Sequence, residues 1–127
     1  MRWPGQLPAG QVNKTTSLAA VDLLPAVCAA VQVNLPSTHR PDGENMFDAL
    51  LGKQQSRAKT IFWNWRGVES QPETWPRWTV RHGDLKMVRD DSNRVELSRS
   101  HENWAETSNV AQAHPDVLVN LTAQLVA

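Results

Sequence analysis

Residues 61–88 read IFWNWRGVESQPETWPRWTVRHGDLKMV, and this stretch decides the fold class of the chain. It opens with β-branched and aromatic residues in rough alternation, a pattern typical of a strand. Two more strand patterns follow, residues 77–83 and 84–90, of which the second runs two residues past the stretch, and they meet at Gly83–Asp84. Antiparallel strands can be joined by such a short turn, whereas parallel strands need a long crossover. The stretch therefore predicts a β-hairpin.

The flanking sequence extends this hairpin into a sheet with a helix. The first strand is predicted over residues 59–66, and a fourth, RVELSRS, over 94–100 after the turn DDSN. The end of the chain, HPDVLVNLTAQLVA, predicts an amphipathic helix with Pro115 near its first position and Asp116 in its first turn. Its apolar face comprises Val117, Leu118, Leu121, Leu125 and Val126. The fold class predicted is α+β, with a small antiparallel sheet of about four strands backed by a C-terminal helix.

The N-terminal half predicts two short helices. Within TSLAAVDLLPAVCAAVQVNLP, the helix is expected to begin at Asp22, whose carboxylate would cap the first turn, and Pro25 would then lie where a missing N–H costs little. A second helix is predicted in NMFDALLG, with Asn45 as its cap and Gly52 as its end. Apolar residues recur at helical spacing in the first helix: Leu18, Val21, Leu24, Cys28 and Val31.

Composition excludes several classes of function. The chain has 127 residues, which is enough for one ordinary domain, and equal numbers of basic and acidic residues, 13 each. A zero net charge argues against nucleic acid as a partner. The one local basic cluster, Lys53, Arg57 and Lys59, is expected in a solvated loop. No apolar run reaches the length of a membrane span, so no membrane partner is expected, and the N-terminus does not read as a signal peptide. As it stands, the chain reads as cytoplasmic or incomplete.

Tryptophan is concentrated in the opening stretch, which holds four of the six tryptophans of a chain without tyrosine. Two interpretations are open: burial in the sheet core and against a larger partner, or a platform on which sugars stack. Burial is favoured because exposing several indole rings is costly. Trp63 and Trp65 are two residues apart and are expected to face the same side of a strand.

Four polar residues are candidates for substrate binding. His82 and Lys86 flank the tight hairpin turn, and His39 and Arg40 precede the Asp42–Gly43 turn. The alternative in both cases is a solvated turn. The histidines show no metal-site spacing. The lone cysteine, Cys28, is interpreted as a small core residue, and one cysteine allows no internal disulfide framework.

Five phrases, in order, resemble the C-terminal part of a sulfatase. MRWPGQLPAGQVNKTTSLAAVDLLPAV resembles the family's RWPG-(x)-(I/L)-PAG and DLLPT, and RPDGENMFDALLGK resembles DG-x-(D/N)-LLP-x-LLG. TIFWNWRG, WTVRHGDLKMV and ETSNVAQAHPDVLVNLTAQL resemble the closing strands and helix. The resemblance covers essentially the whole chain. It is nearest to the arylsulfatase and N-acetylgalactosamine-6-sulfatase branch of the alkaline-phosphatase-like superfamily.

The resemblance implies an organisation and a chemistry. Residues 1–52 would be the end of the alkaline-phosphatase-like core domain, and residues 53–127 the C-terminal subdomain. Sulfatases hydrolyse sulfate esters of carbohydrates or aryl groups. They use a formylglycine made from C/S-x-P-x-R and a divalent cation, usually calcium. The parent proteins are often periplasmic, secreted or lysosomal.

The same resemblance implies that the catalytic machinery lies outside this chain. Cys28 is followed by Ala29–Ala30–Val31–Gln32 and cannot be the modified residue. The family's paired metal-binding aspartates and its catalytic Lys and His precede the matched segments, and Asp90–Asp91 falls in a predicted hairpin loop. No catalytic residue, metal ligand or cofactor is therefore assigned here.

The chain also departs from the family. Leu85 stands where a tryptophan is common, and Ser98–Arg99 stand where a Tyr-Asp pair is common. Met1 falls inside a family segment, which leaves open a truncation or a wrongly assigned gene start.

Three functions stay open from the sequence. The chain could be a sulfatase part that needs a missing catalytic domain as its partner, or a module that binds sulfated carbohydrate by itself. It could also be a gene remnant that folds poorly because its apolar faces are uncovered. The binding module would use the Trp-rich segment with the nearby cations Arg66, Arg77, Arg81 and Lys86.

Overall fold

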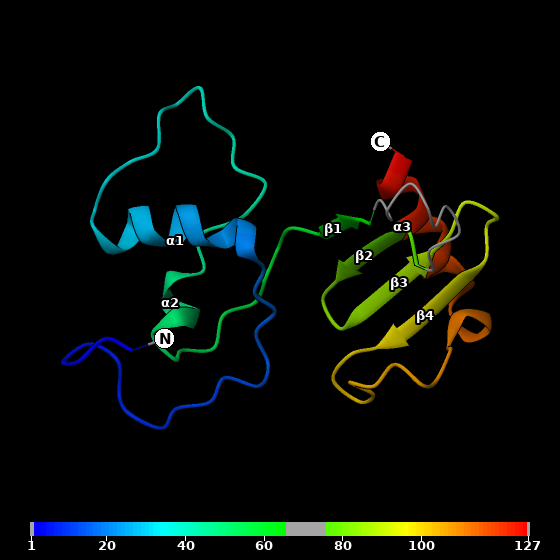
Figure 1. Ribbon diagram of the computed structural model, residues 1–127, viewed down its shortest axis with the longest axis horizontal. Helices are drawn as coiled ribbons and strands as arrows, with labels where there is room; N and C mark the ends of the chain where they lie inside the picture. The colour runs from blue at the N-terminus through cyan, green and yellow to red at the C-terminus, as the bar shows by residue number, and fades with distance from the viewer. Residues whose placement is uncertain (1, 66–75, 127) are drawn as a thin grey trace, which may run out of the picture. The chain divides into compact units, whose positions relative to one another are not determined.

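The computed structural model describes residues 2–65 and 76–126 of the chain (Figure 1). It divides into two compact units, unit 1 from Met1 to Lys59 and unit 2 from Thr60 to Ala127. The boundary predicted between residues 52 and 53 would separate the end of a sulfatase core domain from a C-terminal subdomain, and it stays a prediction.

Unit 2 contains a four-stranded antiparallel sheet in the order of the sequence. The strands are β1 (Ile61–Asn64), β2 (Trp78–His82), β3 (Leu85–Arg89) and β4 (Val95–Arg99), and neighbours in sequence are neighbours in the sheet. Between β2 and β3, Gly83 has a φ of 58°, a conformation that glycine adopts without steric cost. The predicted α+β class and the antiparallel meander are confirmed.

The core of unit 2 lies between the sheet and the C-terminal helix. Val80, Met87 and Leu97 are partners across β2, β3 and β4 and therefore point to one face of the sheet. Helix α3 (Pro115–Val126) covers that face and contributes Leu121 (Figure 1). A short 3-10 helix, η2 (Ala111–Ala113), precedes α3. The predicted apolar face of α3 is confirmed for Val117, Leu118, Leu121 and Leu125.

Trp63 and Trp65 are not in this core, so the prediction of burial in the sheet core is wrong for both. Their burial against a larger partner stays a prediction. Phe62 pairs with Val80, which faces α3, and Trp63 pairs with Thr79 on the opposite face. Because side chains alternate along a strand, Trp65 shares that opposite face. The two tryptophans are 43% and 65% exposed.

Unit 1 contains a 3-10 helix and two short α-helices. They are η1 (Ala20–Asp22), α1 (Leu23–Ala30) and α2 (Phe47–Leu50). Helix α1 begins directly after Asp22, as predicted. Gly52 has a φ of 85° just after α2, so the predicted end of this helix is confirmed. Asn45 accepts a hydrogen bond from the Phe47 N–H at 3.0 Å, but the N-cap residue is Met46, so the predicted cap is wrong by one residue.

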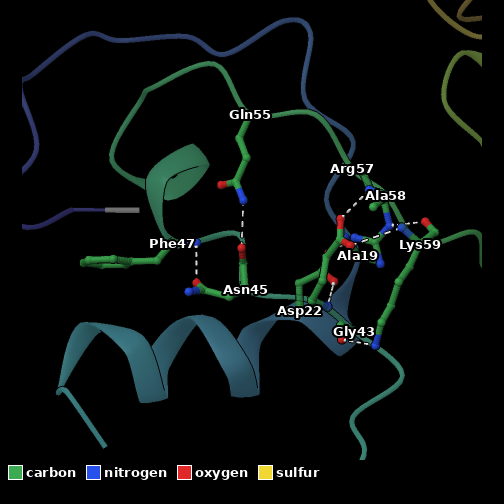
Figure 2. Close-up of polar contacts among 10 residues, drawn as sticks. Ala19, Asp22, Gly43, Asn45, Phe47, Gln55, Arg57, Ala58 and Lys59 are labelled. Atoms are coloured by element: carbon green, nitrogen blue, oxygen red, sulfur yellow. Dashed lines mark hydrogen bonds and ion pairs between the residues drawn. The ribbon is translucent and has the colours of Figure 1, made fainter. Parts of the chain in front are cut away.

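Asp22 does not cap α1, which corrects the prediction of its role. Its carboxylate accepts the Ala19 N–H at 2.8 Å and the Glu44 N–H at 3.1 Å, and it forms an ion pair with Arg57 (Figure 2). The side chains of Arg57 and Asp22 are only 4% and 3% exposed. Arg57 is therefore part of a buried ion pair, and the prediction of a solvated basic loop is wrong for this residue. Leaving a buried carboxylate without a countercharge costs more free energy than leaving a helix end without a side-chain cap.

The same network holds the segment after α2 against the Asp42–Gly43 turn. Lys59 Nζ donates to the Gly43 carbonyl oxygen at 2.9 Å (Figure 2). It also donates to the Pro41 carbonyl oxygen at 2.7 Å. Glu44 in return accepts the backbone N–H groups of Ala58 and Lys59. Polar contacts between segments distant in sequence therefore help to hold unit 1 together.

The apolar stripe of α1 is mostly exposed in unit 1. Pro25 and Ala26 are the buried residues of this helix, while Cys28 is half-buried. The interpretation of Cys28 as a core residue is therefore wrong. Exposed large apolar residues of this segment are Leu18, Val21, Leu23, Leu24, Val27, Val31 and Val33.

Candidate functional site

The open face of the unit 2 sheet carries a groove of about 540 Å³. This face is the one opposite α3. A volume of that order is within the range of sites that hold small ligands. The lining residues are Trp63, Trp65, Pro76, Thr79, Arg81, Lys86 and Glu106.

The aromatic side of the groove is built by β1 and its continuation. The Trp65 N–H donates to the Arg77 carbonyl oxygen at 2.7 Å, so pairing with the neighbouring strand continues beyond Asn64. Trp63 and Trp65 therefore both lie on strand backbone that is paired with the segment of β2. Both line the groove, which confirms the prediction that they share one side of a strand.

The charged side of the groove holds Arg81, Lys86 and Glu106. Arg81 and Lys86 are directly opposite each other on β2 and β3. Lys86 Nζ lies 2.7 Å and 2.9 Å from the two carboxylate oxygens of Glu106, so its charge is paired. The Nε of Arg81 donates to the Gly83 carbonyl oxygen at 3.2 Å, which orients the guanidinium group. Among the described residues its two terminal nitrogens have no hydrogen-bond partner, and they can bind an anion.

A smaller cavity of about 220 Å³ lies between the other face of the sheet and α3. His82 lines it, and His82 Nδ1 lies 3.1 Å from Thr60 Oγ1. Thr60 Oγ1 in turn donates to Gln124 Oε1 at 2.7 Å. His82 thus takes part in a chain of hydrogen bonds that connects β2 to α3.

The predicted site residues do not form one cluster. His82 and Lys86 flank the same turn but lie on opposite faces of the sheet, because His82 pairs with Leu85 and Lys86 pairs with Arg81. His39 and Arg40 are exposed in the loop between α1 and α2 of unit 1. Their roles in substrate binding stay predictions.

Two further residues of the predicted binding segment, Arg66 and Trp75, lie outside the described residues. Arg77, by contrast, is described and forms an ion pair with Asp91.

Pro76, Thr79 and Glu106 line the groove but were not predicted from the sequence. Thr79 could have been found from strand alternation, since it shares a face with Arg81. Glu106 had no local signal, because it contacts Lys86 from 20 residues away in the chain.

The described residues do not fit the formylglycine and calcium that the resemblance implies. Cys28 is followed by two alanines instead of the C-x-P-x-R pattern. No group of three or more His, Cys, Asp or Glu side chains in residues 2–65 and 76–126 is placed to hold a metal ion. In the β3–β4 turn, the Asp90 carboxylate accepts hydrogen bonds from the N–H groups of Ser92 and Arg94.

Within the same described ranges, no helix has the length and apolar character needed to cross a membrane.

The comparison with curated proteins finds a partial sequence match. No protein-family model matches the chain. Over 60 residues, or 47% of the chain, it is 35% identical to arylsulfatase G of Homo sapiens and of Mus musculus. The match spans only 11% of the length of these relatives.

The comparison with solved structures covers more of the chain. A protein solved in complex with its substrate D-glucosamine-2-N,6-O-disulfate matches 98% of the chain with a TM-score of 0.62 and 19% identity. A 2-O GAG sulfatase matches 82% with a TM-score of 0.58 and 21% identity. The third solved protein is associated with the metabolism of multiple glycosaminoglycans by Bacteroides thetaiotaomicron. It matches 82% of the chain with a TM-score of 0.59 and 21% identity.

The chain has the fold of part of a sulfatase. The same matches cover 26%, 23% and 23% of the three solved chains, so the shared fold corresponds to about a quarter of a sulfatase. Together with the arylsulfatase G match, this supports the resemblance to a sulfatase C-terminal part.

Proposed function

We propose that the chain is the C-terminal part of a sulfatase, a sulfuric ester hydrolase, and that it works beside a catalytic domain which it does not contain. The observation that carries this proposal is the match of 98% of the chain to 26% of a solved protein bound to a disulfated glucosamine. The substrate class would be a sulfated carbohydrate or an aryl sulfate. Placement in the arylsulfatase and N-acetylgalactosamine-6-sulfatase branch belongs to the same proposal.

Catalysis by the chain alone is not expected. Sulfate ester hydrolysis in this family needs a formylglycine nucleophile, and no Cys or Ser of the sequence begins a C/S-x-P-x-R pattern. Without that nucleophile, we expect the side chains present to bind and orient a substrate but not to hydrolyse its sulfate ester.

Sulfate release by the purified 127-residue chain tests this proposal. We expect no release above the buffer blank from an aryl sulfate or from glucosamine 2-N,6-O-disulfate, with calcium present. Cys28→Ser should behave identically, because Cys28 has no catalytic role. Turnover that scales with the concentration of the chain would overturn the proposal of a non-catalytic part.

The DNA upstream of the Met1 codon provides an independent test of the parent protein. We expect an uninterrupted reading frame that runs back through C-x-P-x-R or S-x-P-x-R. Stop codons or a frameshift in that frame would contradict a sulfatase made as one polypeptide.

A second candidate, sulfated-carbohydrate binding by the chain itself, is favoured by the groove. Two exposed indole rings beside a guanidinium group combine a stacking surface with an anion site. We expect the chain to bind N-acetylglucosamine 6-O-sulfate more tightly than N-acetylglucosamine, and more weakly as salt is raised.

Trp65→Ala should weaken this binding, and Trp104→Ala serves as a matched control. Trp104 is exposed but is not among the residues that line the groove. Titration calorimetry at low salt measures both variants. Equal affinity for the sulfated and unsulfated sugars would contradict this candidate.

A further inference from the structure

The groove contains an acidic side chain where an anionic ligand would be expected to bind. Glu106 places both carboxylate oxygens on Lys86 Nζ, at 2.7 Å and 2.9 Å. The two side chains are partly buried, with exposures of 26% for Lys86 and 34% for Glu106. A sulfate group binds ammonium through two oxygens in much the same way, so the Glu106 carboxylate occupies the position of a ligand anion.

The segment that carries Glu106 is held in a specific conformation. Glu106 has a φ of 55°, which is uncommon for a residue with a side chain and costs free energy. Its N–H donates to the Asn103 carbonyl oxygen at 3.0 Å, and the Asn103 N–H donates to the Arg99 carbonyl oxygen at 2.9 Å. The turn after β4 is thereby fixed so that Glu106 reaches the open face of the sheet.

Arg81 and Lys86 form a pair of cations of which only one is available. They are direct partners across β2 and β3, so their Cβ atoms are about 5 Å apart. Two anionic groups on one sugar could therefore contact both side chains. In the described structure, Lys86 is neutralised by Glu106, whereas the terminal nitrogens of Arg81 have no partner among the described residues.

We propose that Glu106 selects the charge of the ligand, so that the groove binds a saccharide with a single anionic group on Arg81. The sugar ring stacks on Trp63 and Trp65. A second anionic group is disfavoured because it would have to displace Glu106 from Lys86 against the repulsion of the carboxylate. This inference rests on the carbohydrate-binding function proposed above.

Three glucosamine derivatives and two variants test the proposal. N-acetylglucosamine, its 6-O-sulfate and glucosamine 2-N,6-O-disulfate are titrated into the full chain at low salt. Wild type should bind the monosulfate at least as tightly as the disulfate. Glu106→Gln should bind the disulfate about fivefold more tightly than wild type, the effect of one partly exposed charge pair. Glu102→Gln is the matched control, because it removes the same charge from an exposed position in the same loop and should change nothing.

A double variant identifies the cation involved. Adding Lys86→Gln to Glu106→Gln should abolish the gain in affinity for the disulfate. Circular dichroism checks that each variant keeps the sheet.

The outcomes separate the two proposals. If wild type binds the sulfated sugars and Glu106→Gln leaves the ratio of their affinities unchanged, charge selection is wrong and carbohydrate binding stands. If neither wild type nor any variant binds a sulfated sugar, both proposals fail.

Discussion

At Gly43 the backbone of unit 1 leaves no room for a side chain. A Cβ added there would lie 2.1 Å from the carbonyl oxygen of Val21 and 2.4 Å from its carbonyl carbon. Both are backbone atoms, so the clash is relieved only if η1 moves away from the turn. We expect Gly43→Ala to lower the free energy of unfolding by about 1–3 kcal/mol. Urea unfolding followed by circular dichroism measures it, with the exposed neighbour Asp42→Ala as control. Equal midpoints for the two variants would show that the contact is not rigid.

The carboxyl group of Asp22 has a lowered pKa in folded unit 1. Burial by itself raises the pKa of this carboxyl, but hydrogen bonds from Arg57, Ala19 and Glu44, with the charge of Arg57, lower it by more in total. A carboxyl whose pKa is lower in the folded than in the unfolded chain stabilises the fold above its unfolded pKa. That contribution is lost as the pH falls through the folded pKa.

Asp22→Asn should therefore destabilise unit 1 in a pH-dependent way. At pH 7 we expect a loss of about 3–5 kcal/mol, because the buried guanidinium of Arg57 is left without a countercharge. The difference from wild type should shrink as the pH falls below the unfolded pKa of Asp22 and through its lowered folded pKa, because the carboxyl group then becomes protonated in the wild type too. Urea midpoints at several pH values measure this, with the exposed Asp42→Asn as control. A difference that stays constant over this range would argue against the ion pair.

At the scale of elements, α3 stabilises the sheet through one side of the helix. Leu121 is 3% exposed and packs against Val80, Met87 and Leu97, whereas Val119 on the same helix is 72% exposed. We expect Leu121→Ala to cost about 2–5 kcal/mol of unfolding free energy. Val119→Ala should stay within about 0.5 kcal/mol of wild type. Thermal unfolding of both variants measures the difference. Similar melting temperatures would mean that the packing of Leu121 on α3 does not stabilise this core.

The local sequence predicted best those elements that depend on their own residues. The β2–β3 hairpin was predictable because Gly83–Asp84 is a turn between two alternating segments, and α3 because its apolar residues repeat with helical period. It failed for the environment of these elements. The sequence around Trp63 is the same whether its face of the sheet is covered or open. Only the position of α3 determines which face of the sheet is covered.

At the scale of the whole molecule, the exposed apolar residues of α1 predict self-association. Monomeric proteins rarely leave large apolar surfaces uncovered. We expect the 127-residue chain to associate at increasing concentration. Replacing the exposed Val27 and Val31 by Lys should reduce this association, while Lys14→Gln, an exposed change outside α1, should not. Sedimentation velocity measures it. A wild-type chain that stays monomeric at high concentration would show that this face needs no cover.

The sequence by itself determined the four strands, their antiparallel order and the helix that closes unit 2, because alternation, turn residues and helical period are local properties. The candidate groove depended on tertiary structure. Lys86 meets Glu106 over 20 residues of chain, and Arg57 meets Asp22 over 35. Such contacts form only when the free energy gained by packing offsets the entropy lost in closing the intervening loop. No local pattern records them, and this is why the open face, its charge and the buried ion pair appeared only in the folded chain.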